Sequence, residues 1–329
     1  MKQKCAAIAM LLLLNAGCRE SVELPRKREP RGAAHHVVLI SPESAGQPEH
    51  VILERAGEWL ARRIVGAQIE IRPVGSRSPA QQQRLIEESR HRADILIVWP
   101  IEPEPLAPLL TDAVQRGVGV FLIGSDCGSG SRTAYSGPSE IDLGREAARA
   151  CATALTGRAQ SVLLLHAGDK AERDRSRYLG FTQELGQHGS IHLMHEENCG
   201  GDAIAAVREM RRVSRLYPRS GGWALLNDWP MAALGAKEPL APVGMSVVLV
   251  ATSHRYLADL KAGRIHALVT YDVQEAVRGA LLSAVQWLNQ KEDVRQVDRY
   301  APVETVTGLT LDQHDSRWQS WMKGDSTSE

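Results

Sequence analysis

The side chains best suited to binding chemistry stand where two predicted strands end. Trp99 follows the apolar run Ile95–Val98, and Ser125 and Asp126 follow a second apolar run, Val118–Ile123. Leucine and valine recur at helical spacing between the runs, so strand, helix and strand predict one right-handed βαβ unit. In an open parallel sheet, ligands bind beyond the carboxyl ends of the strands. We therefore expect a ligand site at these strand ends.

Signatures of catalysis are weak in this chain. The loop Gly124–Gly130 (GSDCGSG) is rich in glycine and serine but lacks the lysine and the spacing of a phosphate-binding loop. Cys127 could act as a nucleophile only with a histidine partner, and no pattern supplies one. The pair His35–His36 has no further ligand at metal spacing. We expect no catalytic residue, no metal and no cofactor, and hence a binding protein rather than an enzyme.

The N-terminus has the pattern of an export signal. Lys2 and Lys4 precede a short apolar segment, and the small residues NAG follow it, directly before Cys18. The apolar segment is too short to span a bilayer as a mature helix. Its end, LNAGC, is similar to a bacterial lipobox, although asparagine stands where that motif usually has leucine. The sequence predicts a signal peptide at 1–17, lipidation of Cys18 and a periplasmic or cell-envelope location, with a plain secretory signal or a structural cysteine as the alternatives.

The expected mature chain begins with a tether. Residues 18–34 are charged and contain prolines, with almost no large apolar side chain, which is typical of a flexible linker. The 329 residues include 39 basic and 39 acidic side chains and no basic block, so nothing indicates a nucleic-acid partner. Beyond the tether three cysteines remain, Cys127, Cys151 and Cys199, which allow at most one intramolecular disulfide.

Strands and helices alternate along the rest of the chain, and the alternation runs twice. A break near residue 138 separates the two series, each of which predicts a doubly wound α/β domain with a parallel sheet. The extended segment 133–137 is predicted to cross between the domains. Further breaks lie near residues 251–254 and 271–272, and we interpret the last residues, 312–329, as a polar tail.

Five segments together resemble the type I periplasmic sugar-binding proteins, whose fold is shared by the effector domains of lactose-repressor-like regulators. They are WPIEPEPLAPLLTDAVQRGVGVFLIGSD, AYSGPSEIDLGREAARA, RSRYLGF, ALLNDWPMAALGA and YLADLKAGRIHALVTYD. The resemblance covers residues 36–311. It implies two Rossmann-like lobes joined by three crossing segments. The N-terminal lobe would comprise 35–136 plus 272–298, and the C-terminal lobe 137–271 plus 299–311.

The resemblance also implies which side chains bind the ligand. Arg177 matches the family's sugar-binding arginine, whose planar fork holds adjacent hydroxyls or an anion, although it could be an ordinary surface residue of a helix. Asn227 matches the family's asparagine, able to donate and accept, although it could instead begin a turn. Trp99 could stack on a sugar face or cover the strand end. Tyr271 replaces a usual glutamine and could bind ligand or pack at a hinge.

Departures from the family's pattern bear on the ligand. Gly124 and Ala251 stand where sugar binders normally place hydroxyl-binding aspartates, and Ser125 or Asp126 could compensate only for the first. The usual asparagine and paired phenylalanines are missing near His50, which we interpret as a helix-start residue. The loss of two acceptors favours a ligand richer in acceptors or apolar surface than a simple hexose, such as a modified sugar or a nucleoside-like molecule.

The function implied is that of an exported, lipid-anchored solute-binding protein that closes two lobes on a small sugar-like ligand. Its partner would be an ABC permease or a membrane sensor, and its lipid its only contact with the membrane. A sensory ligand-binding module outside transport is one alternative, and an enzyme or a regulator-derived protein on the same scaffold is another. A regulator would need a helix-turn-helix module before residue 36, where the sequence predicts a signal and a tether.

Overall fold

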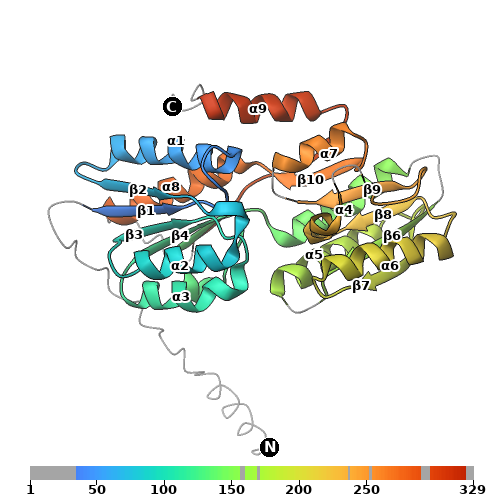
Figure 1. The fold of residues 1–329 in the computed structure, drawn as a ribbon, viewed down its shortest axis with the longest axis horizontal. Helices are drawn as coiled ribbons and strands as arrows, with labels where there is room; N and C mark the ends of the chain where they lie inside the picture. The colour runs from blue at the N-terminus through green and yellow to red at the C-terminus, as the bar shows by residue number, and fades with distance from the viewer. Residues whose placement is uncertain are drawn as a thin grey trace, which may run out of the picture.

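In the computed structural model, two six-stranded sheets form two lobes that lie side by side (Figure 1). The structure describes residues 35–155, 160–168, 171–235, 238–251, 254–289 and 297–323. The predicted signal peptide, lipidated Cys18 and tether lie outside the described residues. No helix in the described ranges is long and apolar enough to cross a membrane.

The N-terminal lobe is a parallel sheet in the order β11-β5-β4-β3-β1-β2. Helices cover both faces, so its central strands are continuous apolar runs. The strands are β1 (His36–Ile40), β2 (Gln68–Arg72), β3 (Ile95–Val98), β4 (Gly119–Ile123), β5 (Ala134–Gly137) and β11 (Val297–Tyr300). The helices are α1 (Pro48–Arg63) and α8 (Val273–Asn289) against one core, and α2 (Pro79–Ser89) and α3 (Pro103–Gln115) against the other.

The C-terminal lobe repeats this plan in the order β12-β10-β9-β8-β6-β7, with only β12 antiparallel to its neighbour. Its strands are β6 (Ser161–His166), β7 (His192–Asn198), β8 (Gly222–Leu225), β9 (Ser246–Val250), β10 (Ala267–Tyr271) and β12 (Val303–Thr307). One face carries α4 (Glu140–Ala154) and α5 (Glu172–Leu185), and the other carries α6 (Ala203–Leu216) and α7 (Leu257–Lys261). The predicted fold class, two doubly wound lobes, is confirmed.

Three segments cross between the lobes. They join β5 to α4 at 137–140, β10 to α8 at 271–273 and β11 to β12 at 300–303. The segment expected to cross, 133–137, is mostly strand β5 of the N-terminal sheet, because its main chain pairs with β4 and β11. The break near 251–254 lies within the C-terminal lobe, and the third crossing, expected from the lobe bounds near 298–299, lies at 300–303. Cys127, Cys151 and Cys199 are free thiols.

The backbones of α4 and α5 are in close contact. A Cβ on Gly144 would lie 2.0 Å from the carbonyl oxygen of Arg177, and one on Gly180 would lie 2.0 Å from that of Ile141. Real side chains do not approach backbone so closely, so only glycine allows this packing. Because α5 also carries Arg177, the contact sets where this side chain reaches the edge of the sheet.

The predicted polar tail is wrong up to residue 323, because helix α9 (Leu311–Lys323) occupies that segment. This helix packs against α1 of the N-terminal lobe and α7 of the C-terminal lobe, so it lies across both (Figure 1). Trp318 is buried in the N-terminal core and Trp321 packs beside it. Two tryptophans one turn apart give the helix its apolar face, although the segment is otherwise polar.

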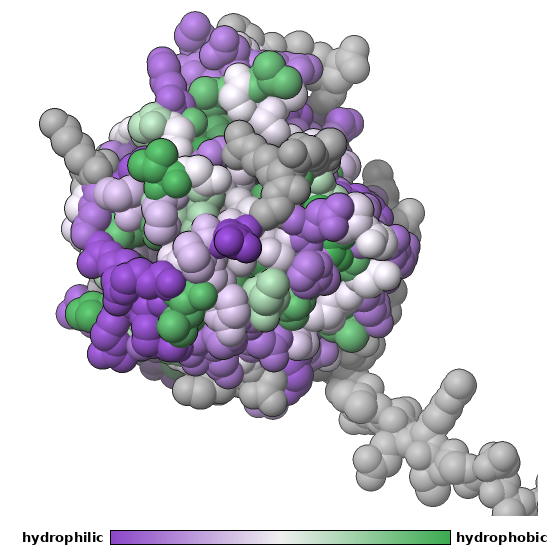
Figure 2. Space-filling view, turned by 90° about the vertical axis from the view of Figure 1, so that its right-hand side faces the viewer, coloured by the Kyte–Doolittle hydropathy of each residue, from purple (hydrophilic) through white to green (hydrophobic). Residues whose placement is uncertain are grey.

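The described residues on the outer face of the C-terminal lobe form no broad apolar patch. Figure 2 shows hydrophobic side chains scattered singly among hydrophilic ones on this side of the molecule. Scattered exposed apolar side chains are normal for a soluble surface.

Candidate ligand-binding cleft

A cleft of about 460 Å³ lies between the lobes, lined by the segments that follow the carboxyl ends of strands in both sheets. Trp99 and Ser125 follow β3 and β4 of the N-terminal sheet, and Asn227 follows β8 of the C-terminal sheet. Arg177 joins them from α5. Four of the six side chains predicted to bind ligand thus line one cleft, in the position where open parallel sheets bind ligands.

Arg177 and Asn227 form the centre of the C-terminal wall. Nη1 of Arg177 donates to Oδ1 of Asn227 at 2.7 Å and to the carbonyl oxygen of Leu226 at 2.9 Å, while its Nε donates to Glu140 at 2.5 Å. Both residues are 8% exposed, so Arg177 is not an ordinary surface arginine. Burial alone would lower the pKa of Arg177, but the charge and hydrogen bond of Glu140 raise it above its usual value. The guanidinium therefore stays charged.

The same wall holds buried polar atoms that have no hydrogen-bond partner among the described residues. They include Nδ2 of Asn227, Nε1 of Trp229 and Oδ1 of Asp174. Nε of Arg173 lies 3.9 Å from that carboxylate oxygen, too far for a hydrogen bond. Leaving such a group unpaired costs about 1–3 kcal/mol. Donors and an acceptor held in this state are suited to receive polar atoms of a ligand.

Sequence reasoning did not identify Asp174 and Trp229. Asp174 lies one helical turn before Arg177, a spacing that places two side chains on the same face of a helix. Trp229 begins the short 3-10 helix Trp229–Ala233, two residues after Asn227. Each could have been found in the sequence from its short distance to an identified residue, Arg177 for Asp174 and Asn227 for Trp229.

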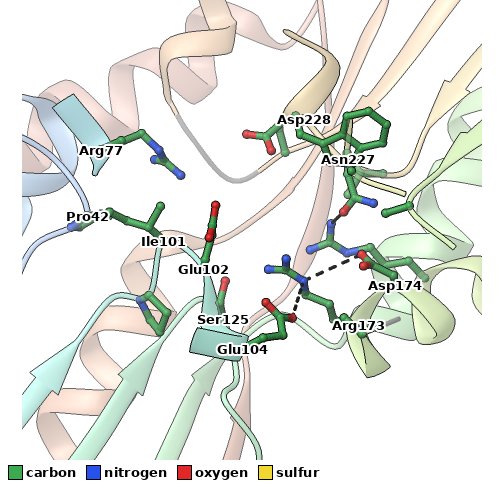
Figure 3. Close-up of a pocket in the computed structure, with 18 of the residues that line it drawn as sticks. Pro42, Arg77, Ile101, Glu102, Glu104, Ser125, Arg173, Asp174, Asn227 and Asp228 are labelled. Carbon is green, nitrogen blue, oxygen red and sulfur yellow. Dashed lines mark hydrogen bonds and ion pairs between the residues drawn. The ribbon is translucent and has the colours of Figure 1, made fainter. Parts of the chain in front are cut away.

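The N-terminal wall is more exposed. Glu102 precedes α3 without capping it through its side chain, and its carboxylate points into the cleft (Figure 3). The Arg77 side chain also points into the cleft, from a different segment of the N-terminal lobe (Figure 3), and its guanidinium pairs with Glu43 at 2.9 Å. Trp99 lines the cleft but is only 4% exposed and packs into the N-terminal core. Its main role is therefore to cover the end of β3.

Direct contacts join the two walls. Nε of Arg173 on α5 lies 3.3 Å from Oε1 of Glu104 on α3, as Figure 3 shows. The backbone N–H of His254 in the C-terminal lobe donates to Glu49 on α1 at 3.3 Å. The lobes therefore touch through polar side chains as well as through the crossing segments.

Two of the predicted binding residues do not line this cleft. Asp126 accepts two hydrogen bonds from Arg132, at 2.7 and 3.0 Å, and lines a neighbouring pocket of about 430 Å³. Tyr271 is fully buried, and a Cβ on Gly124 would lie 2.3 Å from its hydroxyl oxygen. Tyr271 thus packs at the crossing after β10 and occupies the space of a side chain at Gly124. This packing explains why glycine stands where the family usually has an aspartate.

Carboxylates unforeseen in the sequence line the cleft in place of the two missing aspartates. They are Glu49, Glu102, Glu104, Asp174 and Asp228. The premise that the site is poor in acceptors is therefore wrong, and with it the reason for expecting a ligand rich in acceptors. No group of three or more metal-ligating side chains with the geometry of a metal site occurs in the described residues.

Two lobes of parallel sheet, three crossings and a polar cleft between the strand ends define a two-lobed binding protein of the type I periplasmic fold. The family model of the periplasmic binding protein domain matches residues 50–292. The chain therefore belongs to this family, as the resemblance in the sequence implied. Membership implies a domain that works outside the cytoplasm.

Solved structures of solute-binding proteins share the fold. One from Agrobacterium vitis, bound with alpha-D-tagatopyranose, is 17% identical, with a TM-score of 0.67 over 86% of this chain and 98% of that chain. A periplasmic ribose ABC transporter protein from Conexibacter woesei is 18% identical, with a TM-score of 0.65 over 90% and 98%. One from Bacillus halodurans with bound myo-inositol is 17% identical, with a TM-score of 0.64 over 87% and 99%. A comparison with curated proteins gives no match.

Proposed function

We propose that this protein is an exported solute-binding protein that closes its lobes on a small sugar-like ligand and catalyses no reaction. The observation that carries the proposal is the set of buried, unpaired polar atoms on the C-terminal wall: Nδ2 of Asn227, Nε1 of Trp229 and Oδ1 of Asp174. The three residues line the cleft, and Asn227 and Asp174 are each less than a tenth exposed. The ligands named for three proteins of the same fold, two sugars and an inositol, support the same class.

The chemistry of the lining suits a ring that carries hydroxyl groups. A hydroxyl both donates and accepts, so it can satisfy an amide N–H and a carboxylate on the same wall. The indoles of Trp99 and Trp229 contribute apolar edges beside these polar groups. A ligand with alternating polar and apolar faces would use both kinds of surface.

Ligand binding is tested by thermal unfolding of the purified protein with sugars, polyols and nucleosides. A ligand at about a hundred times its dissociation constant should raise the free energy of unfolding by roughly 2.7 kcal/mol. Solution scattering should show compaction at unchanged secondary structure, because the lobes close as rigid bodies. A ligand that binds without compaction would contradict closure, and turnover of that ligand would contradict a purely binding role.

Delivery to an ABC permease is the proposed role of the closed form, with a membrane sensor as the alternative recipient. We also propose that Cys18 carries a lipid and holds the domain in the cell envelope, on the strength of the LNAGC pattern and the following tether. Metabolic palmitate labelling of wild type and of Cys18→Ser tests the anchor. Equal labelling of the two proteins would rule it out.

A further inference from the structure

We infer that the ligand carries a positive charge, as a protonated amine on a sugar-like or polyol frame. This inference rests on the proposed function and names the chemical class of ligand for the same cleft. It follows from the charges that line the cleft, their existing partners and the burial that lobe closure would impose on them.

The arginines of the cleft already face carboxylates. Two of them pair with carboxylates outside the lining, which leaves the lining carboxylates in excess. The four pairs, with their N···O distances, are Arg77 with Glu43 at 2.9 Å, Arg177 with Glu140 at 2.5 Å, Arg173 with Glu104 at 3.3 Å and Arg255 with Asp228 at 3.5 Å.

Glu102 has no cation partner among the described residues, and Asp174 receives no hydrogen bond from the two arginines near it there. The charge of Asp174 acts on Arg177, but Arg177 donates its hydrogen bonds to Glu140, Leu226 and Asn227. No hydrogen bond or ion pair engages the Glu102 side chain in the described residues. Asp174 shares Arg173 with Glu104, and the Asp174 distance, 3.9 Å, is the longer of the two. Asp174 is only 7% exposed. The cleft therefore holds one carboxylate on each wall that a bound cation could neutralise.

Lobe closure makes this imbalance matter. Figure 3 shows the carboxylates of Glu102 and Asp228 directed into the cleft from opposite lobes, with Asp174 deeper on the C-terminal side. Expelling water from between like charges is unfavourable unless a counter-charge enters with the ligand. The hydroxyls of a neutral sugar can hydrogen-bond to carboxylates but bring no charge. A protonated amine supplies both the hydrogen bonds and the charge.

The remaining groups limit the cation to one part of the ligand. Nδ2 of Asn227 and Nε1 of Trp229 are buried donors without a partner in the described residues, and a donor needs an oxygen acceptor, not an ammonium group. The ligand should therefore present neutral oxygens to these donors and its amine to the carboxylates. An aminated sugar or polyol meets both requirements, whereas a simple polyamine meets only one.

A purely structural account exists for part of the pattern. Glu104 and Asp174 lie in the first turns of α3 and α5, and Glu102 precedes α3, where the helix dipole favours negative charge. This account does not explain why an oxygen of Asp174 is buried without a hydrogen bond. The two accounts differ in whether charge on the ligand changes affinity.

Titration calorimetry with matched ligands tests the inference at a pH at which the amine is protonated. D-Glucosamine and D-galactosamine are compared with their neutral parent sugars and with their N-acetyl forms, which keep the nitrogen but lose its charge. We expect at least one amine to bind at least tenfold more tightly than its parent and its N-acetyl form, and less tightly as salt increases. If neutral sugars bind as well as the amines, this inference falls and the proposed function stands. If no member of either set binds, both fall.

Isosteric variants locate the effect. Glu102→Gln and Asp174→Asn should each weaken amine binding about tenfold more than they weaken binding of the neutral parent sugar. Glu102 is exposed and unpaired, so its variant should fold like wild type, and Glu275→Gln on the outer surface of α8 serves as the matched control. Equal losses for amine and parent in both variants would assign these carboxylates to shape or hydroxyl binding and overturn the inference.

Discussion

The two walls of the cleft differ in how firmly they hold their side chains. On the C-terminal wall, Arg177, Asn227 and Asp174 are each less than a tenth exposed, and Arg177 is fixed by three hydrogen bonds. On the N-terminal wall, Glu102 and Glu104 are exposed. A wall that is ordered before binding loses little conformational entropy when ligand arrives. We therefore expect ligand to dock first on the C-terminal wall, and the N-terminal wall to complete the site as the lobes close.

The largest expected effect is that of Arg177→Ala. The substitution would leave the Glu140 carboxylate, which is 15% exposed, without its cation. Breaking a buried ion pair in this way lowers the free energy of unfolding by about 3–5 kcal/mol. Denaturant unfolding without ligand should show most of this loss.

Arg77→Ala is the matched substitution on the other wall. The Arg77 side chain is 23% exposed, against 9% for Arg177, but its partner Glu43 is only 13% exposed and would also lose its cation. We therefore expect a smaller loss than for Arg177→Ala, of about 1–3 kcal/mol. If the two variants lose comparable free energies of unfolding, the two walls do not differ in how firmly they hold their side chains.

The next effect concerns the backbone that supports the C-terminal wall. Gly180→Ala would place a methyl group 2.0 Å from the carbonyl oxygen of Ile141, and overpacking of this kind typically costs about 1–3 kcal/mol. Because α5 must move, ligand affinity should fall with stability. Gly57→Ala in the N-terminal lobe meets side chains and no backbone: the end of Ile71 at 2.8 Å and Cγ2 of Ile69 at 3.2 Å. Thermal unfolding and calorimetry should find the second variant close to wild type in both respects.

Asn227→Ala tests a side chain of the C-terminal wall that we expect to contact the ligand. Its Nδ2 has no partner in the described residues, so the unliganded fold should lose little beyond the bond from Arg177. Affinity should fall by about 1–3 kcal/mol, or roughly ten- to a hundredfold. Ser125→Ala, on the N-terminal wall, should cost less than about fivefold because the residue is half-buried and adaptable. If Ser125→Ala proves the more damaging in calorimetry, the proposed order of docking is wrong.

The elements around the cleft could largely be predicted from the sequence, because each carries its own local signal. The run Ile95–Val98 is strand β3 as predicted, and the second apolar run, Val118–Ile123, contains strand β4 (Gly119–Ile123). Arg177 and Asn227 were identified through short phrases that keep their spacing. Helix α9 was missed because its apolar face consists of two tryptophans in a polar segment, which gives a weak helical period.

What the sequence could not supply was the pairing of charges. Nothing in the order of residues shows that Asp126 binds Arg132, or that the Tyr271 hydroxyl fills the space beside Gly124. Asp126 and Arg132 are six residues apart, whereas Tyr271 and Gly124 lie far apart in the sequence. Both contacts redirect side chains that stand at strand ends. The excess of carboxylates in the cleft likewise depends on which arginines are already neutralised elsewhere.

The smallest expected effect concerns α9, the helix that contacts both lobes. Glu304 on β12 accepts from Arg317 and lies 3.0 Å from Nδ1 of His314, both on α9. Burial raises the pKa of Glu304, but the hydrogen bonds and charges of His314 and Arg317 lower it by more, to below its ordinary value. A carboxyl group with a lowered folded-state pKa stabilises the fold above its unfolded pKa, about 4.3, and loses this contribution as pH falls through the folded value. Wild type should therefore exceed Glu304→Gln in stability at pH 7 by up to about 1 kcal/mol. The difference should shrink below about pH 4 in urea unfolding followed by tryptophan fluorescence. If the difference in stability stays constant down to pH 3, the ionised Glu304 carboxylate does not hold α9 in place. The contact of α9 with the two lobes would then depend on other residues.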